Sequence, residues 1–411
     1  MVAKVGDDAY GTALLENLKR AGVDTAAMTQ TTGSSGLRDG DFLARFGGDE
    51  FAVVVPDSGQ RAIELAGRLL GALQAPVEVG GVAITVRASA GVVCAPEDGA
   101  DADTLLRRAD SAMYAAKRRD AKVHRYGAGD DQGAARRLQL AGQLPAALAS
   151  SQIRVHYQPT VELASGRCEL VEALARWEHP LFGQVGPLEF VSLAEQYGLG
   201  LPLLRRVLSD GLGECARWRA QGLASSVAVN VSPRTLLGPD FLLCVTTELA
   251  RSVLPGEALV LEMTEDAFAC DGPGARDVIG ELADIGVKVA IDDFGTGYSS
   301  LAYLKQLPVA TIKLDQSFVA GLGTTASDDA IVSLAIDVGH QLGLSVIGEG
   351  VETAEQFEAL RRYHCDAAQG YWICRPGPAD LIINWLASYA TGRSGPPHRH
   401  LRVLGGDDGQ G

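Results

Sequence analysis

The 411-residue sequence lacks the long apolar segments of a membrane protein. No run reaches the roughly 18 uninterrupted apolar residues that a spanning helix needs. The first residues, Met1 to Asp8, also lack the apolar core of a secretory signal. We therefore expect a soluble, cytoplasmic protein with no transmembrane segment.

Cysteine is sparse and irregularly spaced. The seven cysteines include no Cys-x-x-Cys pair, so the ligand spacing of a structural zinc site is absent. An odd number of scattered cysteines in a long chain favours reduced thiols over a disulfide framework.

Basic residues are in deficit, with 36 Lys and Arg against 51 Asp and Glu and a formal net charge of −15. An acidic surface repels the phosphate backbone of nucleic acids, so we expect no binding of DNA or RNA. An anionic substrate would need local help from cations or from positioned Arg and Lys side chains. Because 46% of the residues are hydrophobic, the chain can bury the cores of two or three domains.

An α/β pattern runs through residues 37–127. Phe51–Val55 and Val82–Val93 contain predicted strands, and Ala62–Leu73 and Leu105–Lys117 have the apolar spacing of helices. Glycine-rich and polar stretches then divide the chain. The predicted segments are a leader with a linker at 1–36, the α/β domain at 37–127, a linker at 128–137, a second domain at 138–390 and a flexible tail at 391–411.

Eight apolar runs recur in the second domain, most of them followed by a helix-sized segment. Strands that alternate with helices predict a parallel sheet, and eight such units over about 250 residues predict a (β/α)8 barrel of the TIM type. The runs are 153–157, 170–174, 226–231, 258–263, 287–291, 310–314, 345–347 and 367–373.

Nearly every predicted strand of this barrel carries a polar side chain near its carboxyl end. Such ends meet at one mouth of the barrel, where active sites lie. Oxygen-rich side chains favour Mg²⁺ or Mn²⁺, and two such ions about 3.5–4 Å apart suit the attack of water on a phosphodiester. The polar side chains near the ends of the predicted strands are Gln158, Glu172, Asn230, Glu262, Asp292, Asp293, Lys313, Glu349 and Gln369.

The adjacent carboxylates Asp292 and Asp293 could serve two cations. On a regular strand they would point to opposite faces, so we expect Asp293 to lie already in the following loop. Gly295 and Gly297 would let the backbone turn there. Lys313 could then polarise the water or the phosphate.

These residues stand in motifs that resemble the EAL domain family, over roughly residues 138–388. The motifs are Tyr157-Gln-Pro, Glu172-Ala-Leu-Ala-Arg-Trp, Asn230-Val-Ser-Pro, Glu262-Met-Thr-Glu, Asp292-Asp-Phe-Gly-Thr-Gly-Tyr-Ser-Ser, Lys313-Leu-Asp, Glu349-Gly-Val-Glu and Gln369-Gly. The resemblance implies a (β/α)8 phosphodiesterase that hydrolyses cyclic di-GMP to linear pGpG with two Mg²⁺ or Mn²⁺ ions. It also implies a homodimer through this domain.

The resemblance further implies a role for each site residue. One metal ion would be held by Glu172, Asn230, Glu262 and Asp292, and the second by Asp292, Asp293 and Glu349. The catalytic residues would be Lys313, Glu352 and Glu172, and the substrate contacts would be Gln158, Arg176 and Gln369. Glu265 would anchor the loop that follows Asp292 and that couples dimerisation to metal binding in the family.

The earlier domain resembles the GGDEF family of diguanylate cyclases. Arg45-Phe-Gly-Gly-Asp-Glu-Phe matches the signature of that family, and Ala109 to Lys117 continues the resemblance. The family places a nucleotide site and an inhibitory product site here. The implied residues are Arg38, Asp41, Gly47, Gly48, Asp49, Glu50, Arg68 and Lys117.

The GGDEF resemblance is incomplete, because the Asp-rich strand that the family carries upstream of its signature is not found. Residues 5–33 instead resemble a fragment of the ribokinase/fructokinase family without its catalytic segment. Since the missing strand is central to the family's sheet, the remainder must leave a gap or fill it otherwise. We therefore predict no cyclase activity; a regulatory role with GTP bound at the remnant is a hypothesis.

The main alternative to the enzyme is a binding module that captures cyclic di-GMP and signals without hydrolysis. The full set of metal-binding side chains favours the enzyme. A dominant cyclase would need the missing upstream half, and a sugar kinase would rest on the leader alone.

Overall fold

The computed structural model describes residues 2–4, 41–47, 50–73, 77–79, 82–84, 88–118, 121–264, 272–295, 307–323 and 326–391. The predictions for most of the leader, for the tail after Thr391 and for Arg38, Gly48, Asp49 and Glu265 lie outside these residues. The chain divides into two compact units, 1–140 and 141–411, and each is described by itself.

Unit 1 contains a five-stranded sheet with the strand order β2-β3-β1-β6-β7. The strands are β1 (Val2–Lys4), β2 (Phe42–Gly47), β3 (Glu50–Val55), β6 (Ala90–Cys94) and β7 (Val123–Arg125), and β4 (Val77–Val79) and β5 (Val82–Ile84) form a separate hairpin. Helix α2 (Gly59–Leu73) packs on Val53 and Val55, whereas α3 (Ala102–Arg118) packs on Val54 and Val93. Because successive strand residues point to opposite faces, the two helices cover opposite faces of the sheet.

The central strand of unit 1 comes from the leader. Strand β1 pairs in parallel with β3 on one side and with β6 on the other, with Val2 opposite Val53 and Val92. Of the two expectations, a gap in the sheet or a strand from elsewhere, the structure therefore has the second, with residues from outside the GGDEF resemblance.

The segment predicted as a linker, 128–137, is instead the first half of helix α4 (Ala128–Leu148). The Asp130 carboxylate accepts a hydrogen bond from the Gly127 backbone N–H at 2.7 Å and closes the amino end of the helix. Asp130 and Asp131 both lie in the first turn, where negative charge interacts favourably with the helix dipole. These end effects and the Ala- and Leu-rich second half outweigh the helix-weakening glycines near the start.

Unit 2 contains a sheet that closes on itself, as predicted for a barrel. The strand order is β10-β9-β11-β12-β13-β14-β15-β16-β8, and β8 also pairs with β9. The strands are β8 (Ile153–Glu162), β9 (Cys168–His179), β10 (Gly183–Val185), β11 (Ser226–Asn230), β12 (Leu259–Thr264), β13 (Lys288–Phe294), β14 (Thr311–Leu314), β15 (Ser345–Gly348) and β16 (Ala367–Ala368). All eight predicted strands are present, and β10 is a short addition paired only with β9.

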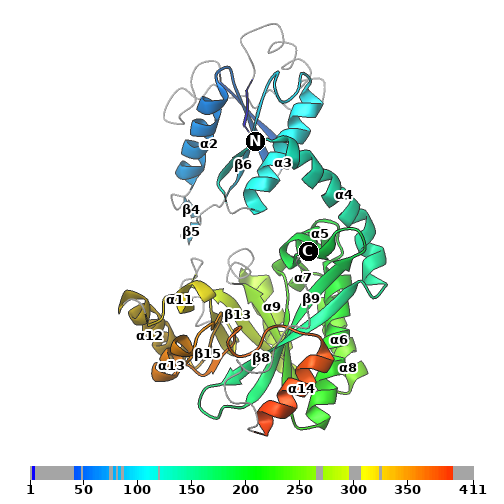
Figure 1. Cartoon of the computed structure of the whole chain (residues 1–411), viewed down its shortest axis with the longest axis vertical. Helices are drawn as coiled ribbons and strands as arrows, with labels where there is room; N and C mark the ends of the chain where they lie inside the picture. Colours follow the sequence, from blue (N-terminus) through cyan, green and yellow to red (C-terminus); the bar gives the residue numbers. More distant parts are fainter. Residues whose placement is uncertain are drawn as a thin grey trace, which may run out of the picture. The chain divides into compact units, whose positions relative to one another are not determined.

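The helices of unit 2 lie on the outer side of this sheet (Figure 1). They are α5 (Pro187–Gln196), α6 (Gly200–Ala220), α7 (Pro233–Leu236), α8 (Phe241–Ser252), η2 (Gly256–Ala258), α9 (Gly272–Asp284), α11 (Gln316–Ala320), α12 (Ala326–Gln341), α13 (Ala354–Arg362) and α14 (Ala379–Ala390).

The expectation of a fully parallel barrel is wrong for its first strand. Strand β8 runs antiparallel to both of its neighbours, β9 and β16. No helix intervenes between β8 and β9, so the chain returns through a hairpin instead of the crossover that parallel neighbours require. The prediction that Gln158 ends its strand at the shared mouth therefore fails. Gln158 lies inside β8, directly opposite Glu172 on β9.

The close packing of β6 on α3 gives a test of unit 1. A side chain added at Gly91 would overlap the Ala109 carbonyl oxygen and the Met113 amide nitrogen. We expect Gly91→Ala to lower the free energy of unfolding by at least about 2 kcal/mol, measured by urea titration of the full chain.

Gly67→Ala in α2 is the matched control, because nothing lies within 4 Å of the position of the added carbon. It should be neutral or stabilising by up to about 1 kcal/mol. Equal effects of the two substitutions would contradict the packing of α3 on β6.

Candidate functional site

The candidate site forms one layer inside the barrel, above a layer of apolar side chains. Leu170, Ala228, Val260 and Ala290 pack together there, from four adjacent strands. The next residue on the same face of each strand is two positions further along. Those four residues are Glu172, Asn230, Glu262 and Asp292. The period of the strands therefore carries four predicted metal-binding side chains to one level of the barrel.

Lys313 on β14 lies at the centre of this layer. Its side chain is only 1% exposed, and its Nζ lies 2.6 Å from Glu349 Oε1, 2.8 Å from Glu262 Oε2 and 3.2 Å from Asp292 Oδ1. A fourth carboxylate oxygen, Glu172 Oε2, lies 3.9 Å away. Burial disfavours the ammonium, but the carboxylates outweigh burial and hold the pKa of Lys313 well above its usual value.

Amide groups hold the Glu172 carboxylate at both of its oxygens. Asn230 Nδ2 donates to Oε1 at 2.7 Å, and Gln369 Nε2 donates to Oε2 at 2.6 Å. Burial raises the pKa of Glu172, but Lys313 and the two amides lower it by more than burial raises it. The net pKa therefore lies below its usual value. Glu172 is thus kept ionised, in the form that binds cations.

The other carboxylates carry charge that Lys313 alone does not balance. Burial raises the pKa of Glu262 well above its usual value, and the neighbouring carboxylates add to this effect. Burial also raises the pKa of Glu349 to about 7. Burial together with Asp292 and Asp315 raises the pKa of Asp293 to about 6. Raised pKa values of this kind mark a cluster that is short of positive charge.

Asp292 and Asp293 come together by a backbone irregularity. The expectation that Asp293 lies in a loop is wrong, because β13 continues to Phe294. The pairing of β13 with β14 shifts register between Ile291 and Phe294, and Asp293 has a left-handed φ of 53°. This irregularity breaks the alternation of faces, so that carboxylate oxygens of Asp292, Asp293 and Glu349 lie within 4.8 Å of one another.

This donor set fits divalent cations. Among the described residues, Glu262 Oε1 and Asp292 Oδ1 are buried without a hydrogen-bond partner, although Asp292 Oδ1 is ion-paired with Lys313. Buried carboxylate oxygens without donors are costly unless a cation satisfies them. The carboxylate group can therefore bind a metal ion, and its oxygen atoms match the preference of hard cations.

The remaining predicted residues of unit 2 differ in their surroundings. Arg176 is partly buried on the same face of β9 as Glu172, and burial lowers its pKa. Gln158 is buried, and its amide bonds to Gln369 and to the Cys374 carbonyl. Glu352 is exposed in the loop between β15 and α13. The sequence did not single out Thr160, a buried side chain that donates to Gln369 Oε1 at 2.9 Å.

In unit 1, the predicted Asp41 side chain has a structural partner. Arg61 on α2 donates to both of its oxygens, at 2.9 and 3.2 Å, and the Asp41 side chain is only 1% exposed. The predicted Arg68 is exposed on α2, and Lys117 lies in the last turn of α3. Gly47 and Glu50 pair with each other where β2 and β3 meet.

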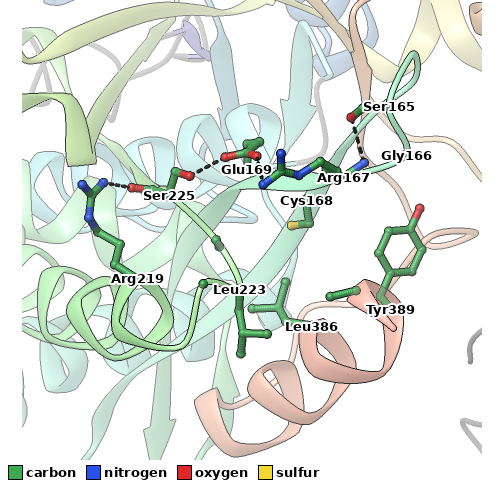
Figure 2. Close-up of a pocket in the computed structure, with 13 residues that line it drawn as sticks. Ser165, Gly166, Arg167, Cys168, Glu169, Arg219, Leu223, Ser225, Leu386 and Tyr389 are labelled. Carbon is green, nitrogen blue, oxygen red and sulfur yellow. Dashed lines mark hydrogen bonds and ion pairs between the residues drawn. The ribbon is translucent and has the colours of Figure 1, made fainter. Parts of the chain in front are cut away.

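A cavity of about 770 Å³ lies at the amino-terminal ends of β9 and β11 (Figure 2). The charged side chains Arg167, Glu169 and Arg219 in its lining all have partners within the lining. Arg167 lies 3.1 Å from Glu169, Glu169 accepts a hydrogen bond from Ser225, and Arg219 donates to the Ser225 carbonyl. Among the described residues, none of the predicted site residues lines this cavity, so it is separate from the carboxylate cluster.

Comparison with known families identifies the barrel. The sequence model of the EAL domain matches residues 141–376, more than half of the chain. The chain belongs to the EAL domain family. A second family model, for the diguanylate cyclase GGDEF domain, matches residues 29–122. Both predicted resemblances and the barrel fold are thereby confirmed, whereas the exact domain boundaries stay predictions.

Two curated proteins whose names refer to cyclic di-GMP are similar to this chain over most of its length. The bifunctional diguanylate cyclase/cyclic di-GMP phosphodiesterase MucR of Pseudomonas aeruginosa is 36% identical over 354 residues, which are 85% of this chain and 52% of MucR. The cyclic di-GMP phosphodiesterase PdeR of Escherichia coli is 34% identical over 385 residues, 93% of this chain and 57% of PdeR. The chain thus spans about half the length of these curated relatives.

The barrel also resembles solved structures. The structure of the PaMucR phosphodiesterase in a c-di-GMP complex matches with a TM-score of 0.57 and 38% identity, over 59% of this chain and 99% of that chain. In the described part of this chain, no helix is long and apolar enough to cross a membrane.

Removal of the Lys313 charge tests the cluster. In the presence of EDTA, Lys313→Met leaves buried carboxylates without their ammonium, and we expect a loss of about 3–5 kcal/mol in the free energy of unfolding of the barrel. Mn²⁺ should reduce this loss, because cations replace the missing charge. Urea titrations with EDTA and with Mn²⁺ measure both effects.

The control is Lys288→Met, which makes the same change at an exposed position of β13. A loss for Lys313→Met no larger than that for Lys288→Met, or a loss that Mn²⁺ leaves unchanged, would contradict the arrangement of the cluster.

Proposed function

We propose that this protein hydrolyses cyclic di-GMP to linear pGpG in a reaction that depends on two divalent cations, Mg²⁺ or Mn²⁺. The observation that carries the proposal is the group of four carboxylates around Lys313 in an EAL barrel, with amides from Asn230 and Gln369 on one of them, Glu172. The names of the relatives MucR and PdeR and the c-di-GMP complex of PaMucR support the choice of substrate.

The residues divide into two cation-binding groups that share Asp292. Glu172, Asn230 and Glu262 complete the first group, and Asp293 and Glu349 complete the second. Asn230 donates its amide hydrogen to Glu172, which leaves its carbonyl oxygen as the atom to bind a cation. Bound cations would supply positive charge for the phosphate and make water a stronger acid.

Lys313 and Arg176 supply the protein's own positive charge. The Lys313 Nζ lies among the carboxylates of the layer, where its N–H groups would donate hydrogen bonds to water or phosphate. Arg176 offers a planar fork of donors that matches a phosphate. Glu352 and Gln369 hold the water, the metal ligands and the substrate in position, and Gln158 contacts the dinucleotide. We also propose that Glu265 anchors the loop after Asp292 and that the barrel forms a homodimer.

A second candidate function is a receptor that binds cyclic di-GMP without hydrolysis. The buried, ionised Glu172 and the buried Glu262 Oε1 without a donor favour the enzyme, because a receptor has no need of a costly carboxylate cluster. The GGDEF unit is proposed to be an inactive cyclase that binds GTP and regulates the barrel.

Substitution of Glu172 separates the two functions. We expect the full chain to release pGpG with Mg²⁺ or Mn²⁺ but not with EDTA, and Glu172→Ala to lower turnover at least about 100-fold through loss of a metal ligand. Chromatography of the nucleotides measures the product. Glu162→Ala, an exposed glutamate at the end of β8, should retain full turnover. Binding of cyclic di-GMP by the wild type without pGpG release would establish the receptor instead.

The GGDEF unit can be tested in the Glu172→Ala background, where any cyclic di-GMP formed from GTP would accumulate. We expect none by mass spectrometry, because the Asp-rich strand of the family is replaced by Val2–Lys4. Accumulation of cyclic di-GMP would show an active cyclase. Wild-type turnover that is unchanged by GTP would remove the regulatory hypothesis.

A further inference from the structure

A chain of hydrogen bonds links the Cys374 backbone carbonyl to Glu172 through the side chains of Gln158 and Gln369, and Thr160 joins this chain at Gln369. Gln158 Nε2 donates to the Cys374 carbonyl at 3.0 Å, and Gln369 Nε2 donates to Gln158 Oε1 at 3.1 Å and to Glu172 Oε2 at 2.6 Å. Thr160 Oγ1 donates to Gln369 Oε1 at 2.9 Å. All four side chains are at most 7% exposed, so water does not compete for these bonds.

The direction of this chain is fixed at its backbone end. The Cys374 carbonyl can only accept, so Gln158 must present its NH₂ group to it and its oxygen to Gln369. Gln369 must then direct its own NH₂ group toward Gln158 and Glu172. The reversed Gln369 amide would place its oxygen against two other oxygens. The amide oxygen of Gln369 therefore faces Thr160, and the Thr160 hydroxyl must donate a hydrogen bond to it.

The main chain around these groups is also held in place. Tyr157 and Gly377 exchange two backbone hydrogen bonds, of 2.7 and 3.1 Å, and fix the segment that carries the Cys374 carbonyl. The Gln369 N–H donates to the Gly348 carbonyl at 2.9 Å. Ala368 pairs with Val161, which brings Gln369 beside Thr160. The β-branched Thr160 side chain adds little freedom of its own.

We propose that Thr160 is a positioning residue for Glu172: Gln158 and Glu172 set the orientation of the Gln369 amide, and the Thr160 hydroxyl holds the amide there by donating to its otherwise unpaired oxygen. Glu172 is then held by Asn230 on one oxygen and by Gln369 on the other, which fixes the plane of the carboxylate. Partners that orient a metal ligand in this way contribute to metal affinity. The proposal rests on the proposed metal-dependent function of the same site.

The test is a calorimetric titration of the full chain with Mn²⁺ alone, in the absence of any dinucleotide, which measures the Mn²⁺ affinity. Thr160→Val keeps the shape of the side chain and removes the hydroxyl, and we expect it to weaken Mn²⁺ affinity about five-fold. Gln369→Leu removes the amide that contacts Glu172 and should weaken it about 10- to 100-fold. Thr160→Ser keeps the hydroxyl and should bind as the wild type does.

Two further variants separate positioning from packing. Thr246→Val makes the same change on the exposed face of α8 and should leave Mn²⁺ affinity unchanged. In the double variant Thr160→Val/Gln369→Leu, the loss of the hydroxyl should have no additional effect, because Thr160 acts through Gln369. Thermal unfolding confirms that each variant is folded, and Thr160→Ala replaces Thr160→Val in the comparison if the latter does not fold.

Three results would overturn the role of Thr160. They are wild-type affinity in Thr160→Val, equal impairment of Thr160→Ser and Thr160→Val, and additive losses in the double variant. A wild-type chain that binds Mn²⁺ but releases no pGpG overturns the proposed hydrolysis and leaves the role of Thr160 in metal binding standing. A wild-type chain that binds no Mn²⁺ overturns both.

Discussion

The site in the barrel depends on one buried positive charge, the ammonium of Lys313. A lysine with 1% exposure is stable only where opposite charges surround it, and here carboxylates from β12, β13 and the end of β15 approach it within 3.2 Å. The same burial that makes Lys313 costly also raises the pKa values of Glu262 and Glu349. The cluster is therefore arranged for more positive charge than the protein itself provides, as a site for divalent cations requires.

The barrel achieves this concentration of charge through regular strand geometry and one departure from it. Alternation along the strands places the oxygen ligands directly above the apolar layer of Leu170, Ala228, Val260 and Ala290. The irregularity at Asp293 then turns a second carboxylate toward the same space. The left-handed backbone of a non-glycine residue is strained, and such strain persists where the surrounding structure and a function maintain it.

Unit 1 forms its sheet around a strand from outside the GGDEF match. The residues Val2–Lys4 occupy the centre of the sheet, between β3 and β6, and supply the backbone partners that a missing strand would have left exposed. Asp41 is joined to Arg61 by two hydrogen bonds and links β2 to α2. A side chain that the family resemblance assigns to ligand binding thus has a structural partner in this chain.

The sequence by itself determined the barrel and most of its site, because both depend on local order. Eight apolar runs and their polar ends are visible without a structure, and the motifs from Tyr157 to Gln369 identify the family. Tertiary structure decided what depends on pairing between distant segments. The antiparallel direction of β8 places Gln158 opposite Glu172, and the bulge in β13 keeps Asp293 on a strand. The role of Thr160 is also invisible in sequence, since its partner Gln369 is separated from it by 209 residues and only closure of the sheet brings the two together.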